Sequence, residues 1–337
     1  MQTIPIFFSA SDSYVPVMSV MIRSIMENAG TGRKYEIVVL HRDITAGSME
    51  KLRAMAAGFP DFSVDFHEMV FDNDKFFVSR HITAEAYFRL FIPFRFQQYG
   101  KALYFDGDMV CRTDISRLFD TDISNYLIGG VRDIGVAWYF LPKKRRNVID
   151  SKTYEYMLSM EKPDEYINSG MLLINCEKFR KTYSEKEIVD TIFSREWQVH
   201  DQDVINFLAN EKILHLGYEW DFMPVSHRAK YLPQELKAGY FEAAKNPKII
   251  HYKPYSCWWH VPHFQHFWKY AARTPFFEEI VGAMDKKGLL NEDVTDKVES
   301  IMRGFGLSDL YKLALGRTFG RIPGFGWLSR IFSPGSR

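Results

Sequence analysis

Short apolar runs alternate with amphipathic stretches along most of this chain, and this alternation limits the folds open to it. Residues 4–10, 36–41 and 62–68 are predicted strands, and amphipathic helices are predicted after the first two, the first beginning at Pro16. Repeated strand–helix units predict an α/β fold: a mainly parallel, twisted sheet with helices on both faces. Ligands of such sheets bind beyond the carboxyl ends of the strands, so polar residues there are candidates for function.

The pattern continues through the middle of the chain. Residues 84–96 predict a helix bent at Pro93, and a buried strand at residues 102–105 leads directly into Asp106-Gly107-Asp108. The remaining predictions are an apolar run at residues 169–176, a helix opening at residue 201, a late strand at residues 248–252 and a polar helix at residues 286–303.

Composition narrows the class of protein. The 337 residues are 46% hydrophobic with a formal net charge of +1, which predicts a folded chain and argues against a nucleic-acid partner. The three cysteines are too widely spaced for a CxxC pair, so a reducing compartment is expected. The amino terminus lacks a basic segment followed by a long apolar core, and no run approaches the roughly 20 apolar residues of a membrane span. We therefore expect a cytoplasmic protein, free or on the inner face of a membrane.

The Asp106-Gly107-Asp108 triplet is the clearest chemical signal. Two carboxylates one residue apart at the end of a buried strand can converge on a hard divalent cation, which prefers oxygen ligands. Such a cation can neutralise the charge that builds on a departing diphosphate. Most Asp-x-Asp triplets are solvated turns. The apolar strand before this triplet is what favours a metal site over such a turn.

Four other motifs are ambiguous when taken alone. Residues 80–90, which include Arg89, can be a surface helix, and the glycine in residues 167–175 can mark a tight strand entry. The acids of residues 201–206 can cap a helix, and His251 can be a structural histidine.

The order and spacing of these motifs resemble glycosyltransferase family 8, a retaining group. The resemblance runs from about residue 4 to residue 260 and implies a GT-A nucleotide-diphospho-sugar transferase fold. It implies a catalytic domain over residues 1–265, followed by a small helical C-terminal extension over residues 266–337. The implied activity is transfer of galactose or glucose from a UDP-sugar to a glycan or glycolipid acceptor of lipopolysaccharide or another surface polysaccharide.

The resemblance also implies the site residues. Asp106, Asp108 and His251 would bind Mn²⁺ or Mg²⁺, while Arg89, Asp201 and Gln202 would act in catalysis. The UDP-sugar would be held by residues from most of the catalytic domain: Ser9, Ala10, Ser11, Ser13, Tyr14, His81, Arg89, Gly107, Asp133, Asn168, Gly170, Asp201, Gln202 and Lys253.

Two positions depart from the family pattern. The family places Lys-Pro-Trp a few residues after the metal histidine, but the matching spacing here reads Cys257-Trp258-Trp259, so Lys253 would have to reach the diphosphate from a shortened loop. Ser11 stands where relatives often carry an acid near the uracil.

Two other functions compete with sugar transfer. A sugar-phosphate nucleotidyltransferase needs a glycine-rich phosphate loop after the first strand, and residues 9–20 contain no glycine. A non-catalytic sugar-nucleotide or glycan-binding protein would not need Asp106, Asp108 and His251 together.

The C-terminal tail predicts peripheral attachment to an anionic membrane. Residues 307–337 mix aromatic and aliphatic side chains with five basic residues and contain no acid after Asp309. Such a segment suits insertion at the headgroup boundary. The alternative is that its apolar residues pack onto the catalytic domain.

Overall fold

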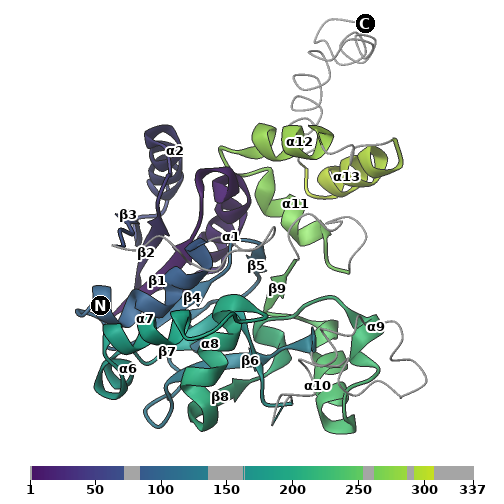
Figure 1. The fold of residues 1–337 in the computed structure, drawn as a ribbon. Helices are drawn as coiled ribbons and strands as arrows, with labels where there is room; N and C mark the ends of the chain where they lie inside the picture. The colour runs from purple at the N-terminus through teal and green to yellow at the C-terminus, as the bar shows by residue number, and fades with distance from the viewer. Residues whose placement is uncertain are drawn as a thin grey trace, which may run out of the picture.

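A seven-stranded sheet forms the centre of the molecule (Figure 1). The computed structural model describes residues 2–71, 84–135, 162, 164–252, 262–286 and 292–306. In sheet order the strands are β3 (Phe62–Glu68), β2 (Lys34–His41), β1 (Thr3–Ser9), β4 (Ala102–Phe105), β7 (Ile167–Ile174), β6 (Ile128–Arg132) and β8 (Ile213–Leu216). The predicted strands at residues 4–10, 36–41, 62–68 and 102–105 are confirmed within two residues.

Strand β7 runs opposite to the other six described strands of this sheet. It pairs antiparallel with both β4 and β6, whereas the other four strand pairs are parallel. Because Phe105 pairs with Met171, the amino-terminal residues of β7 lie at the edge where β4 ends. An antiparallel strand thus brings residues 168–170 to the carboxyl edge of the parallel strands.

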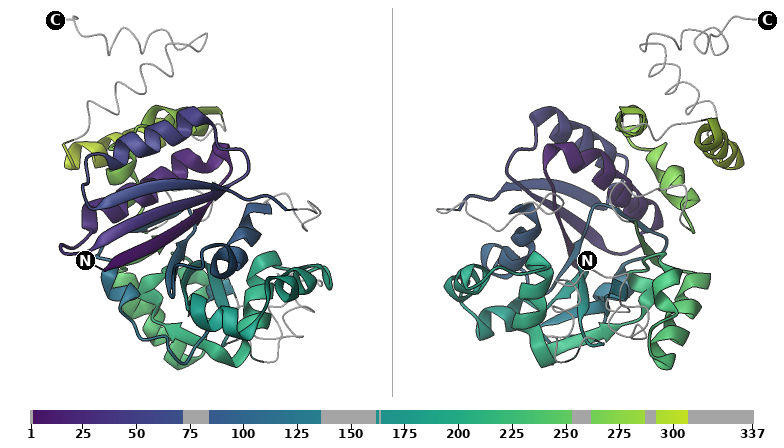
Figure 2. Two further views of the ribbon diagram at one scale, coloured as in Figure 1. Left: turned by 90° about the vertical axis from the view of Figure 1, so that its left-hand side faces the viewer. Right: turned by 45° about the vertical axis from the view of Figure 1, so that its right-hand side comes forward.

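Both faces of the sheet are covered, as the nearly continuous apolar run of β1 indicates, because successive side chains of a strand point to opposite faces. Ile6 and Phe8 face one core with α1 (Val15–Asn28) and α2 (Ala46–Ala56), whereas Phe7 faces a second core. Figure 2 shows the purple and blue helices α1 and α2 on one side of the sheet, together with the yellow-green helices near the C-terminus, and the teal helices on the other side. The second core is covered by η2 (Ala84–Phe91), α3 (Ile92–Arg95), α6 (Cys176–Thr182), α7 (Glu185–Phe193) and α8 (His200–Ala209).

The predicted helix over residues 84–96 is wrong in its detail. The segment is a 3₁₀ helix, η2, followed by the single-turn helix α3, and Pro93 lies in the first turn of α3. A proline is tolerated there because the backbone N–H that it lacks has no partner within the helix.

A second, two-stranded sheet joins two segments that lie far apart in the sequence. Strand β5 (Met109–Cys111) pairs antiparallel with β9 (Ile249–His251), and Phe222 forms an isolated bridge with Ile250. The shorter elements that connect these parts are η1 (Asp12–Tyr14), α4 (Ser116–Phe119), η5 (Asn210–Lys212), η6 (Tyr218–Trp220), α9 (Ser226–Ala229) and α10 (Gln234–Lys245).

Three further helices pack beside α1: α11 (Gln265–Ala271), α12 (Phe277–Lys286) and α13 (Glu292–Gly304) (Figure 1). The Asn28 amide donates to Tyr270 Oη at 2.8 Å, and Arg273 pairs with Glu27 at 2.7 Å. Helix α1 therefore belongs to the cores of both the sheet and these helices, and the domain boundary after residue 265 stays a prediction. None of the helices in the described part of the chain is both long and apolar enough to cross a bilayer.

Candidate active site

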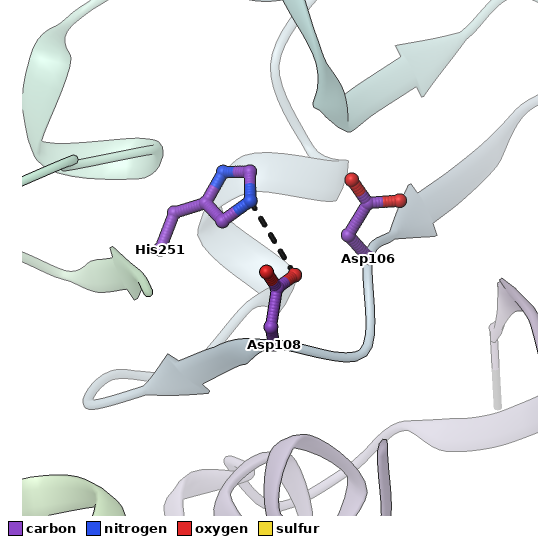
Figure 3. Close-up of side chains that lie close together, drawn as sticks. All are labelled: Asp106, Asp108 and His251. Atoms are coloured by element: carbon purple, nitrogen blue, oxygen red, sulfur yellow. Dashed lines mark ion pairs between the residues drawn. The ribbon is translucent and has the colours of Figure 1, made fainter. Parts of the chain in front are cut away.

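Asp106, Asp108 and His251 converge at the carboxyl edge of the sheet (Figure 3). Asp106 directly follows β4, Asp108 directly precedes β5, and His251 ends β9. The pairing of Met109 with His251 brings the histidine beside Asp108, with Nε2 3.4 Å from Asp108 Oδ1. One possible ligand atom from each of the three residues lies within 4.8 Å of the others.

These three side chains fit a divalent cation. Two carboxylates and an imidazole nitrogen suit Mn²⁺ and leave coordination positions for phosphate oxygens. Gly170 keeps the space beside them open, since a Cβ there would lie 2.5 Å from His251 Cε1 and 3.0 Å from Asp106 Oδ2. From the sequence alone, Gly170 could mark either a tight strand entry or a close approach to a ligand. The structure shows a close approach to the side chains of this cluster.

Asp221, which the sequence analysis did not single out, pairs with the other nitrogen of His251. Its Oδ1 lies 2.9 Å from His251 Nδ1, and both side chains are buried. Burial lowers the pKa of His251, but the carboxylates of Asp221 and Asp108 raise it well above its ordinary value. Burial also raises the pKa of the Asp108 carboxyl. The one feature of the sequence that could have indicated Asp221 is its place between the aromatic residues Trp220 and Phe222.

Arg89 holds two carboxylates in place. Its Nη2 lies 2.9 Å from Asp106 Oδ1 and its Nε lies 3.3 Å from Asp201 Oδ2, while Nη1 donates to the carbonyl of Ser169. The guanidinium also lies over the Tyr104 ring, 4.2 Å from its centroid. Arg89 is 6% exposed, so it orients its partners from below the surface.

The two acids at the start of α8 have different roles. Asp203 Oδ2 accepts from the Val199 N–H at 2.7 Å, which is a capping contact. Asp201 Oδ2 has no hydrogen-bond partner among the described residues and faces Arg89. Burial raises the pKa of Asp201 to about 6, although Arg89 opposes this. Asp203 therefore caps the helix, whereas Asp201 belongs to the candidate active site.

Gln202 connects β7 with the end of β6. Its Oε1 accepts from Asn168 Nδ2 at 3.0 Å and from the Ser169 N–H at 3.1 Å, and its Nε2 donates to Asp133 Oδ2 at 2.7 Å. A backbone donor on the oxygen and a carboxylate on the nitrogen fix the orientation of the amide. Both lone pairs of Oε1 are thus used within the protein.

The loop after β1 packs against the Asp-Gly-Asp turn. A Cβ on Gly107 would lie 2.9 Å from Met18 Cβ and 3.0 Å from Tyr14, so this turn needs glycine. The Ala10 N–H donates to the Leu40 carbonyl at 3.1 Å. Five predicted nucleotide-binding residues lie at this edge. Ser9 ends β1, and the other four follow it: Ala10, Ser11, Ser13 and Tyr14. His81, Lys253 and the Cys257-Trp258-Trp259 run lie outside the described residues.

The strand order and the helices on both faces of the sheet define an α/β fold of the GT-A type. The sequence profile of Glycosyl transferase family 8 matches residues 5–261, and the chain belongs to that family. This confirms the family and the fold predicted from the sequence.

Individual relatives agree with this assignment. General stress protein A of Bacillus subtilis (strain 168) is 25% identical over 79% of this chain and 92% of its own length. Lipopolysaccharide 1,2-glucosyltransferase of Escherichia coli (strain K12) is 26% identical over 40% of this chain and 37% of its own. The solved structure of galactosyltransferase LgtC with donor and acceptor sugar analogues covers 81% of this chain and 96% of its own, with a TM-score of 0.63 and 22% identity. At that identity the likeness shows the shared fold.

Proposed function

We propose that this protein is a metal-dependent, retaining hexosyltransferase that moves galactose or glucose from a UDP-sugar to a glycan or glycolipid acceptor of lipopolysaccharide or another surface polysaccharide. The observation that carries the proposal is the convergence of Asp106, Asp108 and His251 beside Arg89 and Asp201 at one edge of the sheet. Membership of family 8 supports the class of reaction, and the hexose is supported by LgtC, a galactosyltransferase, and by the Escherichia coli relative, a glucosyltransferase.

Asp106, Asp108 and His251 would hold Mn²⁺ or Mg²⁺, which supplies positive charge to the departing diphosphate when it is bound. Arg89 fixes the orientation of Asp106 and so keeps one oxygen of that carboxylate available to the ion. The loop of residues 9–14 lies at the same edge, where it would hold the uridine. The donor sugar would then lie toward Asn168, Gly170 and Gln202.

Retention of configuration is assigned to attack by the acceptor on the same face from which the diphosphate departs. A double displacement needs a free carboxylate next to the anomeric carbon. Gln202 is a poor nucleophile with both lone pairs of its oxygen occupied, and Asp201 faces Arg89. In this arrangement Gln202 positions Asn168 and Asp133, and Asp201 binds sugar hydroxyls.

The direct test is a donor screen. UDP-glucose, UDP-galactose and UDP-N-acetylglucosamine are offered with Mn²⁺, and released UDP is measured with and without excess chelator. We expect release from one of the hexose donors and none in chelator. Binding of a donor without any release would support the non-catalytic alternative.

Gln202→Ala is expected to lower kcat about tenfold while UDP affinity stays within about twofold. The variant releases Asn168 and Asp133, and one lost positioning hydrogen bond of about 1.4 kcal/mol corresponds to that factor. None of the Gln202 hydrogen bonds described above is made with the predicted uridine loop, residues 9–14. Steady-state kinetics and calorimetric UDP titration measure the two quantities, with exposed Gln198→Ala as the matched control. An equal loss of UDP affinity would assign Gln202 a structural role.

The C-terminal tail, residues 307–337, lies outside the described residues, and its attachment to the inner face of an anionic membrane is part of this proposal. Each basic residue near such a surface contributes about 1 kcal/mol. We expect the full chain, but not a chain ended at Phe305, to sediment with anionic liposomes at low salt. If both chains sediment equally, the tail is not the anchor.

A further inference from the structure

Asp221 is a buried carboxylate beside His251, and the proposed function gives it no role so far. It is 3% exposed, and its Oδ2 has no hydrogen-bond partner among the described residues. A buried carboxylate with an unpartnered oxygen is costly, and apolar residues of similar size often replace such groups without loss of stability. Its presence here therefore needs a reason beyond packing.

The contact that Asp221 does make is with His251. Oδ1 of Asp221 lies 2.9 Å from Nδ1, while Nε2 on the other side of the ring lies 3.4 Å from Asp108 Oδ1. Figure 3 shows that this second nitrogen is turned toward the aspartates. Asp221 thus lies across the imidazole from the predicted cation and cannot be one of its ligands in this arrangement.

The backbone holds Asp221 in this position. The Phe222 N–H donates to the Ile249 carbonyl at 2.9 Å, and the His251 N–H donates to the Phe222 carbonyl at 2.9 Å. These two bonds attach the segment of Asp221 to β9 on both sides of Ile250, directly before the histidine. The aspartate and the histidine therefore keep their relative positions together.

We propose that Asp221 is a positioning residue that turns Nε2 of His251 toward the metal and makes it a better ligand. Its carboxylate accepts a hydrogen bond from the Nδ1–H group, which leaves the lone pair on Nε2 and fixes the angle of the ring. Partners of this kind typically contribute a factor of roughly 10–100 to metal affinity. The inference rests on the proposed function, since it requires that Asp108 and His251 bind a cation.

The test is Mn²⁺ binding measured by electron paramagnetic resonance on the purified full chain. Asp221→Leu removes the acceptor and keeps the same branched skeleton of side-chain heavy atoms, and Asp221→Asn keeps an acceptor but removes the charge. We expect roughly 10–100-fold weaker Mn²⁺ binding in the leucine variant and a smaller loss in the asparagine variant. Glu219→Gln is the matched control, because it removes a charge two residues away that pairs with Lys248 and should leave binding unchanged.

Thermal unfolding separates positioning from folding, since we expect Asp221→Leu to unfold no earlier than the parent protein. If Asp221→Leu binds Mn²⁺ as the parent does while Asp108→Asn does not, the positioning role is wrong and the metal site stands. If Asp108→Asn also binds Mn²⁺ normally, the proposed metal site itself is wrong. Equal losses in the leucine and asparagine variants would assign the effect to charge alone and overturn the role of the acceptor.

Discussion

Asp108→Ala is expected to lower kcat by at least about 1,000-fold while the protein stays folded. A bound cation stabilises the charge on the departing diphosphate by several kcal/mol, and 1.4 kcal/mol corresponds to a factor of ten. Asp108 is 4% exposed and lies 3.4 Å from His251 Nε2, so the substitution removes a carboxylate from within the predicted metal site. UDP release with Mn²⁺ is the measurement, together with the melting temperature.

The fold should survive this substitution because Asp108 is poorly stabilised as an anion. Burial raises the pKa of its carboxyl, so the ionised form is less favourable in the folded chain than in water. His251 also keeps Asp221 as a partner. Exposed Asp65→Ala serves as the control for a lost carboxylate. Parent-like turnover in Asp108→Ala, or parent-like turnover of the unmodified protein in excess chelator, would contradict the metal requirement.

Gly170→Ala is expected to lower kcat about 100-fold and to weaken Mn²⁺ binding. The added Cβ would lie 2.5 Å from His251 Cε1 and 3.0 Å from Asp106 Oδ2, so the histidine or the strand must shift. A displacement of about 1 Å at a reacting centre can cost a factor of about 100. Steady-state kinetics and metal titration measure the two effects.

Gly129→Ala is the matched control for that variant. Gly129 lies on β6 and pairs with Leu173 of β7, and a Cβ there would meet its nearest neighbour at 3.4 Å, close to an ordinary contact. We expect near-normal activity from it. If both glycine variants lose activity equally, the effect reflects general damage to the sheet and not the metal site.

Short apolar runs were enough to predict β1, β2 and β4, and alternation with a period of two was enough to predict β3. β3 matches the prediction at both ends, because the side chains of a half-buried strand alternate between a buried face and an exposed face, and the residue types alternate with them. β6 and β8 were not predicted: β6 contains Gly129 and Gly130, which weaken a strand signal, and a Cβ on Gly130 would lie 2.6 Å from Ile167. Gly130 is present for packing, which a local pattern does not record.

The sequence by itself determined that Asp106 and Asp108 follow a buried strand, because the apolar run before them and the spacing of the pair are local features. Only the tertiary structure decided what surrounds them. The antiparallel direction of β7 brings Gly170 to the same edge, and β5–β9 pairing brings His251 beside Asp108. Arg89 and Asp221 acquire their partners in the same way, from segments far apart in the chain. Such contacts depend on strand direction and packing, which the periodicity of one segment does not encode.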